Sequence, residues 1–465
     1  MVPLRAAALL ALLFAATAAA DPFPARTLAE ARAIRDRALM DDTAYETLRS
    51  LTTEVGPRFA GTAGDGRAVA WALAKLRALG FSNVRAESCT VPHWIRGTAQ
   101  AEILAPWPQP LVSVALGGSI ATPPEGIEAE VVSVTTLEEL KTLAPGDVAG
   151  RIVFFTNRML RTRDVSGYAA AVKVRGSGAA AAAKLGAAAV VIRSIGTSSD
   201  RIAHTGGMRF EAGEKRIPGL AISNPDADLL EREFASGRPV RMRISNTSQW
   251  ADSTRSANVI GEIPGGARRN EIVLLGAHLD SWDLGTGAHD DGAGVAIVTA
   301  AALRAGAARP ARTIRVVLFA NEEFGTSGSR AYAELHAAEL PRHVLGMESD
   351  LGAFRPWGLS SCVPIDRLPL ARAMHALVEP LGIQFLGNEA TGESDVGKLK
   401  DLGVPVMDVA TDASEYFDYH HTQNDTFDKI HPQQLRQNVA AYATIAFLAA
   451  QPGADFGRAP KKLRE

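Results

Sequence analysis

Cysteine is scarce in this 465-residue sequence, with only Cys89 and Cys362, far apart along the chain. Two cysteines cannot build the disulfide framework of a small secreted domain, so a hydrophobic core must hold the fold together. Neither thiol has a histidine or an aspartate beside it, which argues against a cysteine nucleophile. A single bridge between the two and a pair of separate buried thiols both stay open.

The sequence also has no large excess of positive or negative charge. The formal net charge is -2, which predicts no nucleic-acid partner and no attraction to an anionic membrane. Aromatic residues make up only 6% of the chain, but 46% of the residues are hydrophobic, so we expect a well-buried globular protein rather than a disordered one. A chain of this length is long for one core and predicts two or three modules.

No apolar run reaches the roughly 20 residues that a transmembrane helix needs. The N-terminal run from Ala6 to Ala16 follows Arg5 and precedes the small residues Ala18 to Ala20, which is the pattern of a secretory signal peptide. We therefore expect residues 1–20 to be a signal peptide and the mature protein to be exported, either periplasmic or secreted, with no membrane span.

The chain changes character near residues 122–126, TPPEG. Short apolar strands around an alanine-rich helix follow, with proline and glycine at the joints. This pattern predicts a small inserted α/β domain over residues 126–248, which separates an N-terminal part, residues 21–125, from a C-terminal part, residues 249–465. The insert holds no acid–base cluster. His204 and Met208 lie there in a polar, glycine-containing loop, and their spacing gives no support for a role in covering a cleft.

Beyond the insert, apolar strands alternate with helical segments. This alternation of strands and helices predicts an α/β fold with a mostly parallel central sheet and helices on both faces. Chemistry in such sheets is concentrated at the carboxyl ends of the strands. The strands are expected at Ile272–Leu275, Ile314–Phe319, Val344–Met347 and Val404–Val409.

Acids or histidines follow every one of these strands. The pair His278 and Asp280 is by itself a weak indication of a metal site. Because four strands end in such groups at the same edge of the sheet, one or two bound metal ions explain the pattern better than four coincidences do. The candidates are His278, Asp280, Asp290, Asp291, Glu322, Glu323, Glu348, Asp350, His420 and His421.

The types of ligand atom limit which metal ions the site can bind. Histidine and carboxylate without thiolate suit Zn²⁺, with Co²⁺ or Mn²⁺ as substitutes. Five side chains can hold two ions about 3.5–4 Å apart when one carboxylate is shared. Of the neighbours Glu322 and Glu323, one can then bind metal while the other accepts a proton from water.

The motifs GAHLD, GAHDDGAG, ANEEFG, MESD and YHHTQNDT resemble those of the co-catalytic zinc exopeptidases, the family that includes bacterial leucyl aminopeptidase and glutamate carboxypeptidase. The resemblance covers nearly all of the mature chain, and the insert resembles a protease-associated domain. It implies the zinc exopeptidase fold and two Zn²⁺ per chain. The implied activity is hydrolysis of dipeptides or short peptides, with a metal-bridging hydroxide as the nucleophile.

The resemblance also implies a role for each candidate. His278 and Asp350 would complete one metal site, Glu323 and His421 the other, and Asp290 would bridge them. Glu322 would be the general base, while Asp280 and Asp291 would lie behind the ligands, with Asp280 orienting the His278 ring. Because relatives turn sharply after the bridging carboxylate, we expect a cis peptide bond between Asp290 and Asp291.

Two assignments within this set have alternatives. His421 is preferred to His420 as the ligand because Thr422 follows it directly and Asp425 stands four residues later, as in related HTxxDT motifs. His420 would then either donate a hydrogen bond to the substrate oxygen that becomes negative or pack beneath His421. Glu348 lies on the same strand face as Asp350 and stays an alternative to it.

Rival functions are a metal-free binding protein of the same fold and a one-zinc acyl-transferring cyclase. The intact ligand set argues against the first, and the second needs neither five ligands nor the insert. The sequence does not separate aminopeptidase, carboxypeptidase and dipeptidase, and it leaves a homodimer open. An arginine that binds a carboxylate would favour a carboxypeptidase, and the candidates are Arg158, Arg161 and Arg355.

Overall fold

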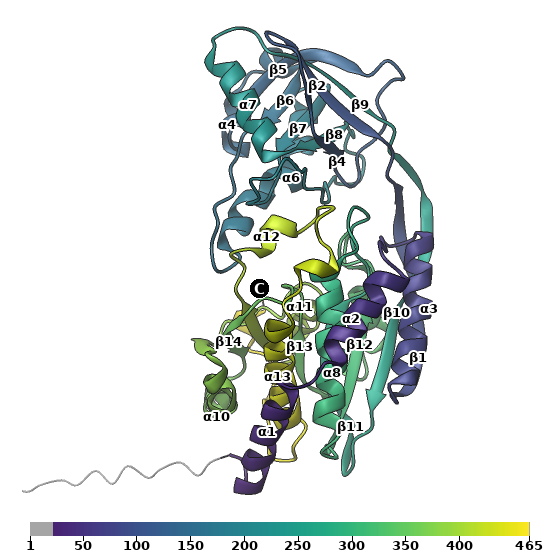
Figure 1. Ribbon diagram of the computed structural model, residues 1–465, viewed down its shortest axis with the longest axis vertical. Helices are drawn as coiled ribbons and strands as arrows, with labels where there is room; N and C mark the ends of the chain where they lie inside the picture. Colours follow the sequence, from purple (N-terminus) through teal and green to yellow (C-terminus); the bar gives the residue numbers. More distant parts are fainter. Residues whose placement is uncertain (1–21, 465) are drawn as a thin grey trace, which may run out of the picture.

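The protein consists of two lobes, each built on an eight-stranded sheet (Figure 1). The structure is a computed structural model that describes residues 22–464, so the predicted signal peptide lies outside the described residues. We call the lobe that contains the C-terminal helix the main lobe and the other, uppermost in Figure 1, the insert lobe.

The main-lobe sheet has the order β1-β10-β12-β11-β13-β16-β14-β15. Its central strands β12, β11, β13 and β16 are parallel, whereas β10 pairs antiparallel with β12 and β14 with β16. The predicted α/β fold is therefore confirmed, with antiparallel pairs at the flanks. The strands are β1 (Ser82–Ile95), β10 (Gln249–Ile263), β11 (Arg268–His278), β12 (Arg312–Phe319), β13 (His343–Glu348), β14 (Pro356–Cys362), β15 (Gln384–Gly387) and β16 (Val406–Thr411).

Helices cover both faces of this sheet. Along β11, Val273 and Leu275 pack into the core beneath one set of helices, while Ile272 and Leu274 pack into the core on the other face. Burial on both faces explains why these strands are continuous apolar runs in the sequence. The first face carries α1 (Ala25–Ala38), α2 (Thr43–Glu54), α3 (Ala63–Ala78), α8 (Ala293–Gly306), α10 (Leu368–Val378) and α13 (Pro432–Ala449), and the second carries α9 (Ser327–Leu335) and α11 (Val396–Asp401).

The insert lobe repeats this layered plan. Its sheet has the order β3-β2-β9-β5-β6-β7-β8-β4, with β5, β6, β7 and β8 parallel. The helix α6 (Ser166–Lys184) packs on one face and α7 (Asn224–Ala235) on the other. The strands are β2 (Ala99–Ala105), β3 (Gln109–Leu111), β4 (Ser113–Ala115), β5 (Ile127–Val134), β6 (Ile152–Phe155), β7 (Ala189–Arg193), β8 (Gly219–Ile222) and β9 (Arg241–Asn246), and the short helices are α4 (Leu137–Thr142) and α5 (Pro145–Val148).

The strands of the insert lobe begin at Ala99, before the boundary that the sequence suggests at residue 126. The reason is that β2 pairs antiparallel with β9, from Ala99 opposite Asn246 onward, so the segment that precedes residue 126 joins the sheet of the insert. The chain passes between the lobes at residues 96–98 and 247–248, where the Thr98 N–H donates to the Thr247 hydroxyl at 2.9 Å. The alternation of apolar and polar residues continues through β1 and β2, so the sequence pattern does not show where the chain passes from one lobe to the other.

The lobes share apolar contacts at their junction. The helix α12 (Tyr416–Tyr419) lies between them (Figure 1), and its residues Tyr416 and Phe417 belong to the same buried cluster as Val174 of α6. Cys89 and Cys362 are buried and free, so the alternative of two separate thiols holds. Between residues 22 and 464, none of the helices combines the length and the apolar character needed to span a bilayer.

Candidate metal centre and active site

Parallel strands bring the predicted acids and histidines to one edge of the main-lobe sheet. The register pairs Gly276 of β11 with Glu348 of β13, so His278 and Asp350 lie level with each other two residues later. His278 also pairs with Phe319, the last residue of β12, and Glu322 follows three residues beyond. Side chains separated by more than forty residues in sequence therefore meet because the strands end together.

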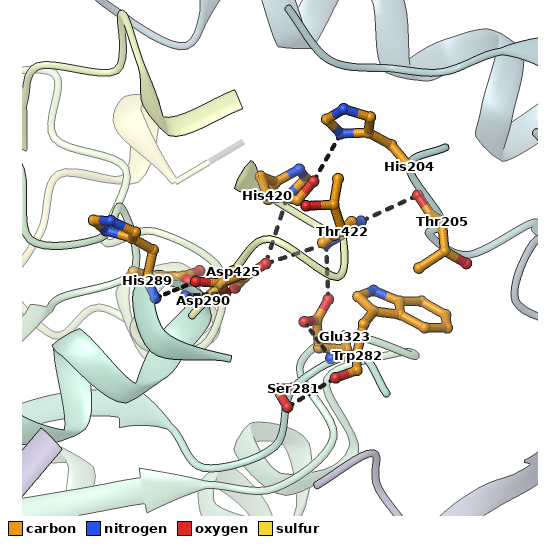
Figure 2. A network of polar contacts seen from close by, with 12 residues as sticks. His204, Thr205, Ser281, Trp282, His289, Asp290, Glu323, His420, Thr422 and Asp425 are labelled. Atoms are coloured by element: carbon orange, nitrogen blue, oxygen red, sulfur yellow. Dashed lines mark hydrogen bonds and ion pairs between the residues drawn. The ribbon is translucent and has the colours of Figure 1, made fainter. Parts of the chain in front are cut away.

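Asp290 occupies the centre of this group, and Figure 2 shows it together with Glu323 and His420. Its Oδ1 lies 3.2 Å from His278 Nε2, and its Oδ2 lies 3.3 Å from His421 Nε2. On the far sides, Asp350 Oδ1 lies 3.1 Å from His278 Nε2, and Glu323 Oε2 lies 3.0 Å from His421 Nε2. The two histidines are thus each placed between Asp290 and one further carboxylate.

Two clusters of potential metal-ligand atoms share Asp290. Atoms of His278, Asp290 and Asp350 lie within 4.8 Å of one another, and so do atoms of Asp290, His420 and His421. The second cluster contains His420 where the resemblance implies Glu323, although Glu323 contacts His421 directly. Asp290 Oδ2 is buried and makes no hydrogen bond, so this oxygen has the free lone pairs that a ligand needs.

Burial and mutual charge strongly shift the pKa values here. Burial lowers the pKa of His278, but the negative charge of Asp350 and a hydrogen bond with Asp290 outweigh it and raise that pKa well above its usual value. Burial raises the pKa of Asp290, yet its contacts with His278 and His421 bring it well below the usual value. A cation bound by His278 and the two carboxylates would neutralise their negative charge.

Glu322 differs from these ligand candidates. Burial, and then the charge of Asp350, raise its pKa well above the usual carboxyl value. Its carboxylate makes no hydrogen bond or ion pair with any residue from 22 to 464, and it lines the cavity beside the cluster. A carboxylate with a raised pKa and a free face is suited to accepting a proton.

Two buried residues hold the loop that carries Asp290. The Asp425 carboxylate accepts hydrogen bonds from three consecutive backbone N–H groups, those of Ala288, His289 and Asp290, at 2.6–3.1 Å. The guanidinium of Arg58 donates to the carbonyl oxygens of Leu279, Thr286 and Gly287. The sequence contains Asp425 in its last motif but no local sign of this role, and Arg58 has no motif at all.

Asp280 and Asp291 support the first histidine through backbone groups. His278 Nδ1 lies 3.0 Å from the carbonyl oxygen of Asp280, whereas the nearest Asp280 carboxylate oxygen is 3.8 Å away. That carboxylate accepts instead from the Glu322 N–H at 3.1 Å, and Asp291 accepts from the His278 N–H. The peptide bond between Asp290 and Asp291 is cis, so that prediction is confirmed.

The insert lobe supports the other histidines. His204 Nδ1 lies 2.8 Å from the His420 carbonyl oxygen, to which its N–H donates. The Thr205 N–H donates to the His421 carbonyl at 3.0 Å, and the Thr205 carbonyl lies 3.3 Å from His421 Nδ1. The loop that the sequence marked by His204 and Met208 therefore reaches the centre from the opposite lobe.

His420 itself faces the cleft. Its ring stacks on that of His421 at 3.5 Å, and its Nε2 lies 3.6 Å from Asp290 Oδ2. The rings of Tyr168 and Phe417 each lie 5.2 Å from it. Its Nδ1 is buried without a hydrogen-bond partner, so His420 has one ring nitrogen against the cluster and one unused.

A cavity of about 660 Å³ opens beside the cluster, lined by both lobes. Of the arginines suggested by the sequence, Arg158 pairs with Asp228 and Arg161 with Asp418, and neither they nor Arg355 line the cavity. Its cations come from elements far apart in sequence, which no local motif connects. They are Arg175, Arg209, Arg216, Arg330 and Lys398.

Comparison with known proteins agrees with this arrangement. Residues 258–446 match the model of peptidase family M28. The chain is 35% identical to carboxypeptidase Q of Bos taurus over 408 residues, which cover 87% of this chain and 85% of that protein. The chain belongs to peptidase family M28. The predicted exopeptidase family is thereby confirmed, and the chain is an enzyme of that family.

One solved structure gives the same family, and a second shares the fold. The crystal structure of a peptidase M28 precursor from Shewanella amazonensis SB2B is 47% identical, covers 94% of this chain and 99% of its own, and superposes with a TM-score of 0.92. A zinc aminopeptidase from Bacillus subtilis shares the fold at 19% identity, with a TM-score of 0.64 and coverage of 89% of this chain and 97% of its own. The M28 fold therefore extends over both lobes.

Proposed function

We propose that this chain is an exported di-zinc exopeptidase that hydrolyses peptide bonds of dipeptides or short peptides. The observation that carries the proposal is the Asp290 carboxylate, whose two oxygens face two separate groups of potential ligands at the base of a cleft. Zinc fits because the donors are imidazole and carboxylate without thiolate. A zinc aminopeptidase from Bacillus subtilis with the same fold supports this choice.

In this proposal His278 and Asp350 hold one ion, Glu323 and His421 hold the second, and Asp290 holds both. The Asp290 Oδ2, which makes no hydrogen bond, and the excess of buried carboxylates over histidines fit two cations. When bound, the ions would supply Lewis-acid polarisation of the scissile carbonyl and acidification of water. The chain itself supplies orientation, through the loop held by Asp425 and Arg58 and through Thr205 behind His421.

Glu322 acts as the general base in this scheme. Its backbone is held by the Asp280 carboxylate, while its own carboxylate lies free in the cavity. Glu322 accepts the proton of the attacking water and returns it to the departing amine. Burial, and then the charge of Asp350, raise the pKa of Glu322 above the usual carboxyl value, which makes it a stronger base.

His420 acts as the hydrogen-bond donor to the substrate oxygen on which negative charge develops. The place of His420 on the cavity wall, with Nε2 facing the acidic cluster, supports this role. Burial lowers the pKa of His420 well below its usual value, and the charge of His421 adds to that effect. The neutral ring keeps one N–H to donate. A packing role beneath His421 is the competing assignment.

Export rests on residues 1–20 as a signal peptide, and the resemblance of the insert to a protease-associated domain is part of the same proposal. Cell fractionation with an antibody against the mature chain tests export, and a cytosolic location would contradict it. Light scattering of the purified protein decides whether it forms a homodimer.

The experiment that tests the function combines metal analysis with a substrate panel. We expect two zinc ions per chain at saturation, loss of activity on chelation, and recovery with zinc or cobalt. Unblocked, N-blocked and C-blocked dipeptides then separate aminopeptidase, carboxypeptidase and dipeptidase activity. Full activity with one ion per chain would contradict the two-ion scheme, and no turnover of any peptide would favour the binding-protein alternative.

A further inference from the structure

The cleft beside the acidic cluster contains more positive charge than the chemistry requires. Of its cations, Arg175 is buried and occupied, because it donates to the Tyr168 hydroxyl at 2.5 Å and contacts His421 Nδ1 at 3.4 Å. The side chains of Arg209, Arg330 and Lys398 are exposed, so solvent screens their charge. Arg216 differs from both groups, because its side chain is partly buried and makes no hydrogen bond or ion pair within residues 22–464.

Arg216 is held by two aromatic rings. Its guanidinium carbon lies 4.2 Å from the centre of the Trp250 ring and 5.2 Å from that of Phe210. It has no hydrogen bond and no ion pair with any residue in the described range 22–464. Burial alone, with no charged neighbour, lowers its pKa. The guanidinium is therefore positioned through its face, while all of its N–H donors stay free.

The ring beneath Arg216 is itself fixed and lies next to the reacting groups. The Trp250 indole N–H donates to the Gly118 carbonyl at 3.0 Å. The centre of the Trp250 ring lies 5.6 Å from that of Phe324, and Phe324 directly follows Glu323. Arg216, Trp250, Phe324 and Glu323 line the same cavity, so one cavity connects the acidic cluster with the guanidinium.

We propose that Arg216 binds the free C-terminal carboxylate of the peptide substrate, so that the enzyme acts as a carboxypeptidase or dipeptidase. This inference rests on the exopeptidase function proposed above. A planar guanidinium with its donors free matches the two oxygens of a carboxylate. The substrate ammonium group would instead be repelled by Arg216, and an amidated C-terminus would leave the guanidinium without a charged partner.

The test compares two variants on two substrates. Arg216→Gln removes the charge but keeps a polar side chain. Arg238→Gln is the matched control, since Arg238 also stacks on an aromatic ring of the insert lobe, 5.4 Å from Trp107, but does not line the cavity. The zinc-loaded proteins are assayed with leucyl-leucine and with leucyl-leucinamide.

For Arg216→Gln we expect kcat/KM for leucyl-leucine to fall about 10- to 100-fold, mainly through KM, as befits loss of a charge-assisted contact. The residual rate with the amide should stay within about twofold of that of the unmodified enzyme, and Arg238→Gln should match the unmodified enzyme on both substrates. Equal losses on the acid and the amide, or no loss on either, would overturn the assignment while leaving the exopeptidase function intact.

A binding measurement separates the two proposals if no peptide is hydrolysed. Calorimetry with the metal-free protein compares acetyl-leucine with acetyl-leucinamide, so it requires no catalysis. We expect the acid to bind at least about tenfold more weakly to Arg216→Gln than to the unmodified protein, with no such change for Arg238→Gln. Equal affinity of the unmodified protein for the acid and the amide would contradict the role of Arg216, whatever the activity.

Discussion

The two lobes share an architecture but not a chemistry. Each has an eight-stranded sheet with four adjacent parallel strands and helices on both faces. In the insert lobe, the group at the end of β7 is Arg193, which donates to the Thr156 carbonyl at the end of β6 and pairs with Asp228 and Glu231. In the main lobe, acids and histidines that follow the strand ends converge on the Asp290 carboxylate instead. The fold alone therefore does not locate the site, whereas this convergence of potential ligands does.

The insert lobe still contributes to the site. Its loop around His204 and Thr205 contacts the backbone of His420 and His421, and Arg216 projects its charge into the cleft. We infer that the main lobe supplies the reacting groups and the insert lobe supplies support and selectivity. The following predictions test that division of roles.

The largest effect is expected for Glu322→Gln in the main lobe. Loss of the general base should lower kcat by about 10²–10⁴-fold, because the amide cannot accept a proton. Both metals should remain bound, as measured by metal analysis of the purified variant. Glu323→Gln is the control and should lose zinc instead. A near-normal kcat in fully metallated Glu322→Gln would assign the base elsewhere.

A somewhat smaller loss is expected for His420→Ala, which lies where the lobes meet. If its ring donates to the developing negative oxygen, kcat should fall on the order of 10²-fold while KM and zinc content change little. Steady-state kinetics with parallel metal analysis measures this. Loss of zinc or of folding stability as the main effect would show that His420 serves as support for His421.

His204→Ala tests the support from the insert lobe. The change leaves the His420 carbonyl without its partner, so the free energy of unfolding should fall by about 1–3 kcal/mol. Activity should also fall, by less than the His420→Ala loss, because the segment carrying the two histidines loses an anchor. His343→Gln in the main lobe is the control, since His343 is equally buried but is remote from the cleft. Urea unfolding and kcat are measured for both, and equal kcat values would refute a supporting role.

The smallest effect is a dependence of stability on pH that the two lobes share. Burial lowers the pKa of His343 and of His204 to about 4. The unfolded chain, with a histidine pKa of about 6.5, binds protons that the folded one does not, so this stability is complete above about pH 6.5 and is lost as the pH falls toward 4.

At pH 5, the lowered pKa of each histidine should reduce the free energy of unfolding by up to about 2 kcal/mol relative to neutral pH. Unfolding free energies of the unmodified protein and of His343→Gln at pH 7.5 and 5.0 measure the contribution of the main lobe. The variant should show the smaller decrease between the two values. An identical decrease in both proteins would mean that His343 is protonated in the folded state or is not buried in solution.

The sequence by itself determined the layered fold and the position of the reacting groups along the chain. Continuous apolar runs such as Ile272–Leu275 define buried parallel strands, since both faces of the sheet are covered. Polar residues that directly follow such a run lie at the strand ends, so His278, Glu322 and Asp350 could be placed from local order alone. The boundary of the insert could not, because β2 pairs with β9 across more than a hundred residues.

Only the tertiary structure decided which atoms meet around these groups. The contact between Thr205 and His421 joins residues 216 positions apart. Packing also decides that the carbonyl of Asp280, rather than its carboxylate, faces His278. Arg216 has no sequence signal, because its free donors depend on which rings stack on it and on which acids lie too far away. Local pattern encodes strands and their ends, whereas long-range contacts depend on how the two lobes pack together.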